Sequence, residues 1–153
     1  MLPFSQHQAP DLWGFLFVGG WVDLNNLKRK FKMPKKIKSP TTIESVGNKP
    51  KTINEFIGLV NSKTSSVSIA HMQSPCGWTE PGQRPDFDEY TIILEGRLKV
   101  ETEDDILYIN SGEAIITYAG EWVKYSTPDK NGAKYIAVCI PAFTPETVNR
   151  DNN

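Results

Sequence analysis

From Ser66 to Ile140 the chain is a succession of short segments in which apolar and polar residues alternate, separated by turns rich in Gly, Asp and Asn. This period of two places successive side chains on opposite faces of a strand, whereas an amphipathic helix needs apolar residues three or four positions apart. The segments expected as strands are 66–72, 89–94, 97–101, 106–109, 113–118, 122–126 and 134–140. So many short strands at regular spacing predict an all-β sandwich or barrel.

Glycine and proline mark the places where these segments should end. Gly96, Gly112 and Gly120 each follow or precede an alternating segment and are expected to reverse the chain, because a positive φ angle costs little only for glycine. The proline-rich stretch 75–85 is expected to be a long loop, since proline excludes an α-helix there. Residues 53–58 are the one stretch predicted as a short helix or an extended lead-in.

The length of the chain and its charge pattern predict one domain with an N-terminal extension. A chain of 153 residues can bury one substantial core and is too short for two comfortable domains. Seven basic residues crowd positions 28–38, which is typical of a solvated linker, with a phosphate-contacting arm as the alternative. We therefore predict an extension and basic linker over 1–39 and the domain over 40–153. Met33 would also be a sensible start for the domain, in which case residues 1–32 are dispensable.

Composition narrows the partners and the compartment. The formal net charge of −1 gives no reason to expect a nucleic-acid or membrane partner. The apolar stretch 12–24 is too short and too interrupted by glycine to cross a bilayer, and it is expected to pack on the domain or on a neighbouring subunit. Cys76 and Cys139 form no paired motif, which favours free thiols and a cytoplasmic location. A disulfide between them, or a soft-metal role for Cys76, is the alternative.

Two glycine-anchored motifs connect this chain to a known family. The pattern Gly-x5-His-x-His-x3–4-Glu-x6-Gly is met in spacing by Gly77, Gln83, Pro85, Glu89 and Gly96. The pattern Gly-x5-Pro-x-Gly-x2-His-x3-Asn is met in spacing by Gly112, Tyr118, Gly120, Val123 and Thr127. Over roughly residues 66–145 the chain thus resembles the cupin family. The resemblance implies a jelly-roll barrel (a double-stranded β-helix) and a homodimer, and some cupins of this appearance are ethanolamine-utilisation proteins.

Only part of the set of metal ligands that the cupin resemblance implies is present in this chain. Family members bind a divalent metal through three histidines and a glutamate, and of these only Glu89 is present. Gln83 offers an amide oxygen, whereas Pro85 and Val123 offer no ligand. His71 would join them if its face of the strand 66–72 points inward. A site for Mn, Fe, Ni or Zn built from Glu89, Gln83 and His71 is expected to be weak or absent, because imidazole supplies most of the affinity of such sites.

The barrel interior is the expected ligand site. Strand alternation and the loop before Glu89 predict a lining of Gln83, Glu89, Thr91, Tyr118 and Tyr125, with Trp78 at the mouth. One acid, one amide, phenols and an indole suit a small polar organic ligand. A carboxyl group at an apolar barrel mouth is expected to have a raised pKa, which makes Glu89 the candidate catalytic acid or base. The structural alternative for Glu89 is pairing with Arg84, with Lys124 or with backbone amides.

Other polar and aromatic residues are expected to have structural roles. Glu80, Asp86 and Asp88 should solvate the loop, Tyr135 should lie in the core or at a subunit contact, and Arg150 should hold the tail to the barrel.

Three functions remain open at this point. The first is a cupin that binds a small molecule with a weak metal or none. The second is a metal-assisted enzyme, such as an isomerase, a lyase or a dioxygenase-like cupin, that uses Glu89 and Gln83. The third is a non-catalytic structural module with a vestigial pocket. The sequence does not decide whether the protein is an enzyme.

Overall fold

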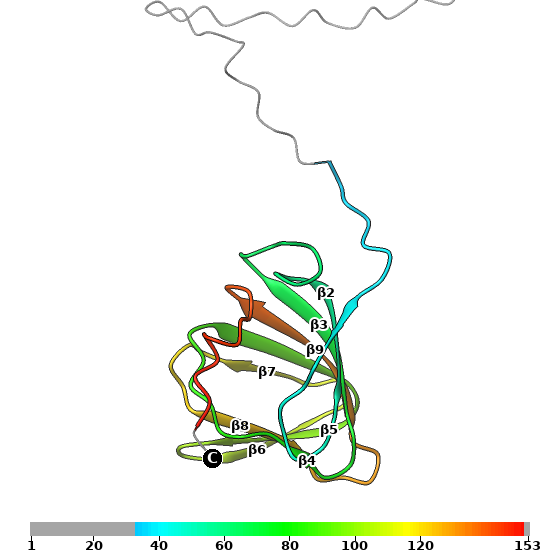
Figure 1. The fold of residues 1–153 in the computed structure, drawn as a ribbon. Coiled ribbons are helices and arrows are strands. Elements are labelled where there is room, and N and C mark those ends of the chain that lie inside the picture. The colour runs from blue at the N-terminus through cyan, green and yellow to red at the C-terminus, as the bar shows by residue number, and fades with distance from the viewer. Residues whose placement is uncertain (1–32, 152–153) are drawn as a thin grey trace, which may run out of the picture. The chain divides into compact units, whose positions relative to one another are not determined.

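A computed structural model describes residues 33–151, and the chain divides into two units, Met1–Lys35 and Lys36–Asn153. The apolar stretch 12–24, the extension 1–32 and positions 28–32 of the basic run lie outside the described residues. Lys36 to Asp151 form strands, turns and loops with no helix, which confirms the all-β prediction (Figure 1). Within the described range no helix is long and apolar enough to cross a membrane.

The strands lie close to where alternation placed them. They are β1 (Thr41–Ile43), β2 (Thr52–Ile57), β3 (Ser68–Ser74), β4 (Trp78–Thr79), β5 (Asp88–Thr102), β6 (Ile106–Asn110), β7 (Ala114–Thr117), β8 (Val123–Thr127) and β9 (Ala133–Ile140). The stretch 53–58, predicted as a helix or an extended lead-in, is extended and forms most of β2. Neither β1 nor β4 was predicted, because two or three residues are too few to show an alternation.

All strand pairs are antiparallel, and they form two layers that share β5 (Figure 1). The first half of β5 pairs with β9 and β7, and β9 continues to β3, β2 and β1. The second half of β5 pairs with β8 and β6, and β8 pairs with β4. One long bent strand therefore carries the chain from the first layer to the second, so that the two layers curl around an interior.

Gly96 does not reverse the chain, so that prediction is wrong. β5 runs through it and bends after a register shift, which is the geometry of a β-bulge. Gly96 has a φ of 74°, and a Cβ atom there would collide with the carbonyl oxygen of Gly132. Glycine is required for the bend and for this close approach. Gly112 and Gly120 lie between strands as predicted, with φ of 86° and 84°.

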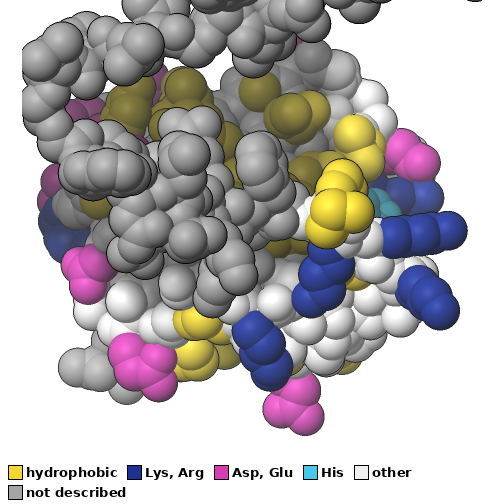
Figure 2. Space-filling model, turned by 90° about the horizontal axis from the view of Figure 1, so that it is seen from above, with side chains coloured by type: hydrophobic (Ala, Val, Ile, Leu, Met, Phe, Trp, Pro, Cys, Tyr) yellow, Lys and Arg dark blue, Asp and Glu magenta, His cyan; other side chains and the backbone are white. Residues whose placement is uncertain are grey.

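The two faces of the first layer differ in character. The inward side chains of β5 include Thr91 and Ile93, each 1% exposed, and they continue into a core cluster with Trp78, Leu98 and Val100. The outward face instead leaves large apolar side chains in solvent, namely Tyr90, Ile92, Leu94, Ile116 and Ile140. Figure 2, seen from above Figure 1, shows hydrophobic side chains reaching the surface beside Lys and Arg. The interior that the core cluster leaves unfilled is the cavity described next.

Candidate functional site

The barrel encloses a cavity of about 90 Å³, which has space for several water molecules. Its wall is part apolar, with Ile43, Ile53, Met72, Phe87, Phe143 and Val148. Its polar lining includes Lys51, Glu80, Gln83, Glu89, Tyr135 and Arg150. A cavity that combines an apolar wall with a few converging polar groups is the usual form of a small-molecule site.

Strand alternation explains which side chains reach this cavity. On β3 the side chains of Ser68, Ala70 and Met72 line it, so His71 lies on the opposite face. The hypothesis that His71 points into the barrel is therefore wrong. In the strand ladder His71 is opposite Asn54 of β2 and Ile136 of β9.

Glu89 enters the cavity from the first residues of β5. Its Oε1 atom accepts a hydrogen bond of 2.9 Å from the Thr91 hydroxyl, and its Oε2 atom lies 4.0 Å from the Cys139 sulfur. Burial, and then the nearby Glu80 carboxylate, raise the pKa of Glu89 to about 7. Burial also raises the pKa of the Cys139 thiol, so this cysteine is not a nucleophile at neutral pH.

A buried ion pair faces Glu89. The Lys51 ammonium lies 3.6 Å from Glu80 Oε2, and both side chains are 7% exposed. The same ammonium lies 3.4 Å from the Tyr135 hydroxyl and 3.8 Å from the centre of the Trp78 ring. Burial alone would lower the pKa of Lys51, but Tyr135 and Glu80 outweigh it and the pKa is raised. Lys51 is therefore a fixed positive charge inside the barrel.

The sequence-predicted ligand residues divide into two groups. Gln83, Glu89 and Tyr125 line the cavity, and the Tyr125 hydroxyl forms a 3.0 Å hydrogen bond with Thr117. Thr91 does not line the cavity but positions Glu89 through its hydroxyl.

Two other candidates lie elsewhere than expected. Trp78 is fully buried in the core cluster, where its ring contacts Lys51, because β4 belongs to the second layer and turns this side chain into the core. Tyr118 is 55% exposed, because it lies just beyond the end of β7 on the outward side.

The side chains at the cupin metal positions do not fit a metal centre. Gln83 and Glu89 supply one amide and one carboxylate, while Pro85 and Val123 supply nothing. The Lys51 ammonium in the same cavity opposes a second cation. Within residues 33–151 no three His, Cys, Asp or Glu side chains converge to hold a metal ion. We therefore assign no chemical step to a metal here.

The sequence analysis did not place four residues in the cavity, namely Lys51, Glu80, Tyr135 and Arg150. Glu80 was expected to solvate its loop and instead is 7% exposed, because it continues the alternation that buries Trp78. Lys51, Ile53 and Glu55 alternate with period two and all line the cavity. This alternation was not recognised for Lys51 because it lies close to the basic run. Tyr135 was assigned to the core, where it does pack, but its hydroxyl also reaches Lys51.

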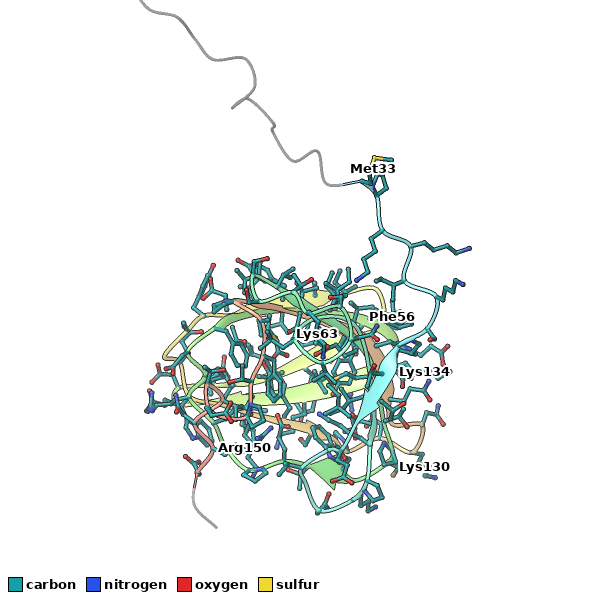
Figure 3. All side chains as sticks on the ribbon, turned by 45° about the horizontal axis from the view of Figure 1, so that its top comes forward. Met33, Phe56, Lys63, Lys130, Lys134 and Arg150 are labelled. Atoms are coloured by element: carbon teal, nitrogen blue, oxygen red, sulfur yellow. The ribbon has the colours of Figure 1, made fainter. Side chains whose placement is uncertain are left out.

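The last described residues close one side of the cavity. Residues 147–151, which we name the C-terminal strap, run antiparallel to the loop 82–86. The amide of Asp86 donates to the Thr147 carbonyl at 2.8 Å, and the amide of Asp151 donates to the Gly82 carbonyl at 2.8 Å. The indole of Trp122 also donates to Asp151 at 2.9 Å. Figure 3 shows Arg150 on this segment beside the barrel.

Solved structures with the same fold define the class of protein. The chain is similar to the polyketide cyclase RemF from Streptomyces resistomycificus, with TM-score 0.64, 16% identity and coverage of 79% of this chain and 88% of that chain. It is similar to a predicted oxalate decarboxylase from Thermotoga maritima, with TM-score 0.57, 18% identity and coverage of 67% and 92%. It is also similar to the Cnp3 cupin domain from Schizosaccharomyces pombe, with TM-score 0.53, 12% identity and coverage of 60% and 61%. The domain has the cupin fold.

A sequence comparison then gives the family. The profile of the family described as Ethanolamine utilisation protein EutQ matches residues 41–144, and the chain belongs to this family. Among curated proteins it is similar to Endoribonuclease YbeY of Myxococcus xanthus, with 42% identity over 96 residues, which are 63% of this chain. The matched segment is 33% of that protein, so this chain spans about a third of the length of its curated relative.

Proposed function

We propose that this EutQ-type cupin domain binds a small, partly polar organic molecule in its barrel cavity. The observation that carries the proposal is the convergence of Lys51, Glu80 and Glu89 on a cavity of about 90 Å³. Removing each charged group from water costs several kcal/mol, and a barrel needs no such groups to be stable. Strongly perturbed ionisable groups in a cavity are characteristic of binding and catalytic sites.

The same observation favours binding over a vestigial pocket. In a purely structural module, the interior would be expected to fill with its own apolar side chains, because cavities and buried charges both lower stability. Here the core cluster fills one part of the barrel, while the cavity keeps its space and its polar groups. Cavity space of this size favours a ligand with fewer than about ten non-hydrogen atoms.

Acid–base catalysis on the bound molecule is a second candidate, and Glu89 favours it. A carboxyl group with a pKa of about 7 exchanges a proton readily at neutral pH, which suits an isomerase or lyase reaction. The metal-assisted form of this hypothesis, including the dioxygenase-like one, has no support in the donor set at Gln83 and Glu89.

A cavity-filling variant tests the binding proposal. Ala137 is 2% exposed and lines the cavity, whereas Ala114 is exposed on β7. We expect Ala137→Leu to abolish ligand binding and Ala114→Leu to preserve it. The probe is a fragment library of carboxylates, amides, amines and alcohols, screened against the full chain by thermal unfolding and confirmed by calorimetry.

Binding of one chemical class to the wild type and to Ala114→Leu, but not to Ala137→Leu, supports the proposal. No binding by any class, or binding that Ala137→Leu leaves unchanged, contradicts it. Ala70→Val, a smaller change on the same wall, serves if Ala137→Leu unfolds. For the enzyme candidate, Glu89→Gln should bind the fragment class that the screen identifies and fail to turn over its reactive members.

A further inference from the structure

The C-terminal strap brings an arginine to the cavity wall. Arg150 lines the cavity and forms an isolated antiparallel bridge with Gln83. Bridged residues on neighbouring strands project side chains to the same side, with Cβ atoms about 5 Å apart. Arg150 and Gln83 therefore form a neighbouring pair at the cavity. Arg150 also lies beyond residues 41–144, the region that matches the family profile.

Both members of this pair have an unsatisfied polar atom. Arg150 Nε and Gln83 Oε1 are buried and have no hydrogen-bond partner within residues 33–151. Gln83 as a whole is only 4% exposed. Arg150 forms no salt bridge in the same range, and the buried Glu80 carboxylate pairs with Lys51 instead. A buried donor and a buried acceptor left without partners are costly, so a ligand that supplies both is favoured.

The two unsatisfied atoms define complementary ligand chemistry. A guanidinium group presents a planar set of N–H donors that matches a carboxylate. The amide oxygen of glutamine accepts a hydrogen bond from a hydroxyl or an amino group. Of the two basic side chains at the cavity, Lys51 is paired with Glu80, so Arg150 is the one that can bind an anionic group of a ligand.

We propose that Arg150 and Gln83 together recognise a small carboxylic acid that carries a hydroxyl or amino donor near its carboxylate. Arg150 binds the carboxylate and Gln83 accepts from the donor. This inference rests on the proposed function, since it names the ligand class of the same cavity. Residues on the apolar wall, such as Met72 and Val148, then contact the short carbon chain of the ligand.

A set of matched probes tests the charge preference. Lactate, lactamide and 1-amino-2-propanol share a short hydroxylated carbon skeleton and differ in carrying a negative charge, no charge or a positive charge. We expect the full chain to bind lactate tightest by calorimetry. Arg150→Gln should weaken lactate binding about ten- to a hundredfold and lactamide binding much less, because the hydrogen bonds to a charged carboxylate are stronger than those to a neutral amide.

Two further variants separate recognition from structure. Arg150→Lys keeps the charge without the planar fork, so it should recover part of the affinity for lactate. Arg84→Gln is the matched control, because Arg84 lies on the loop that pairs with the strap and is 48% exposed in a surface ion pair. It should not change lactate binding. Thermal unfolding of each variant checks the fold, and Arg150→Lys carries the test if Arg150→Gln unfolds.

Gln83 has a separate readout. Propionate lacks the hydroxyl of lactate, so the wild type should prefer lactate, and Gln83→Met should remove that preference while still binding both acids. The inference is overturned if lactamide or the amine binds as well as lactate, or if Arg150→Gln binds lactate like the wild type. In those cases the cavity still binds small molecules and the proposed function survives. If neither these probes nor the fragment library bind, the proposed function fails first.

Discussion

In the layer formed by β3, β9 and β5, the inner face holds polar groups among its apolar side chains, whereas the outer face exposes large apolar side chains. Inside, the strands present Glu89 and Ser68 to a cavity that also holds a buried lysine, and Thr91 donates a hydrogen bond to Glu89. Outside, the same β5 strand exposes Tyr90 and Ile92 to solvent. A sheet that served stability alone would place apolar residues inside and polar ones outside. This departure from the usual pattern supports our proposals of a ligand for the inner face and of a second copy of the chain for the outer face.

The difference also shows how a single strand can serve both faces. Because side chains alternate, each substitution on β5 affects one face and leaves the other intact. The inner face depends on compensated charges, and the outer face depends on apolar area. The two faces are therefore expected to respond differently to mutation, to pH and to protein concentration.

Breaking the inner ion pair should have the largest effect on stability. Lys51→Met leaves Glu80 buried without a partner, so the free energy of unfolding should fall by about 3–5 kcal/mol at neutral pH. The matched outer variant is Lys134→Met on β9, whose pair with Glu95 has side chains 44% and 65% exposed. It should cost less than about 1 kcal/mol. Chemical denaturation measures both, and equal losses would refute the contrast between the faces.

Removing the charge of Glu89 should have a pH-dependent effect of intermediate size. The pKa of Glu89 is about 7 in the folded state and 4.5 as the ordinary value, so the folded protein keeps a proton that the unfolded chain releases between these pH values. Wild-type stability therefore carries a Glu89 penalty that grows as pH rises through this window. Glu89→Gln should match the wild type near pH 4 and be more stable by about 3 kcal/mol near pH 8.

The charged groups facing Glu89 are Glu80 and Lys51, and they remain in the variant, so the comparison isolates Glu89. Glu95→Gln is the control, because Glu95 lies on the same strand and is 65% exposed. It should change the free energy of unfolding by less than about 1 kcal/mol. If the difference in unfolding free energy between Glu89→Gln and the wild type is constant with pH, Glu89 is ionised throughout this window and the prediction is wrong.

The fold and the place of Glu89 could be predicted because both follow from local rules. Alternation in β5 put Glu89, Thr91 and Ile93 on one face, and the structure has all three facing inward. Glycine positions marked most of the turns. The prediction that Gly96 reverses the chain was wrong because a glycine indicates a positive φ but does not say whether the chain turns back or bends onward.

The rest of the site depends on contacts between distant segments. Lys51 and Glu80 meet only because β2 and the loop after β4 come together across the barrel. Arg150 follows the last strand in a stretch without periodic pattern, and it reaches the cavity through backbone bonds to the loop 82–86. No local signal reports such a pairing. His71 was placed on the wrong face because alternation groups residues by face but does not say which face is inner.

The outer face carries the remaining expectation, that two copies of the chain associate. We propose that the cupin homodimer expected from the family resemblance uses the apolar outer face of this layer. Its exposed members belong to adjacent strands, since Tyr90 of β5 is opposite both Ile116 of β7 and Val138 of β9. A contiguous apolar surface of this kind is typical of an interface between subunits.

Placing a charge on this face should have the smallest effect on the stability of one subunit and a clear effect on assembly. Ile92 is 50% exposed, so Ile92→Lys should change the unfolding free energy of the isolated subunit by less than about 0.5 kcal/mol. It should nevertheless halve the mass measured by light scattering, because a buried lysine on each side of a symmetric interface opposes association. Leu107→Lys is the matched control, since Leu107 is 38% exposed on β6 in the other layer. A wild type that is already monomeric, or an equal effect of both lysine substitutions on the mass, would contradict the proposed interface. The predictions for the inner face would still stand, because they concern side chains on the other side of the same strands.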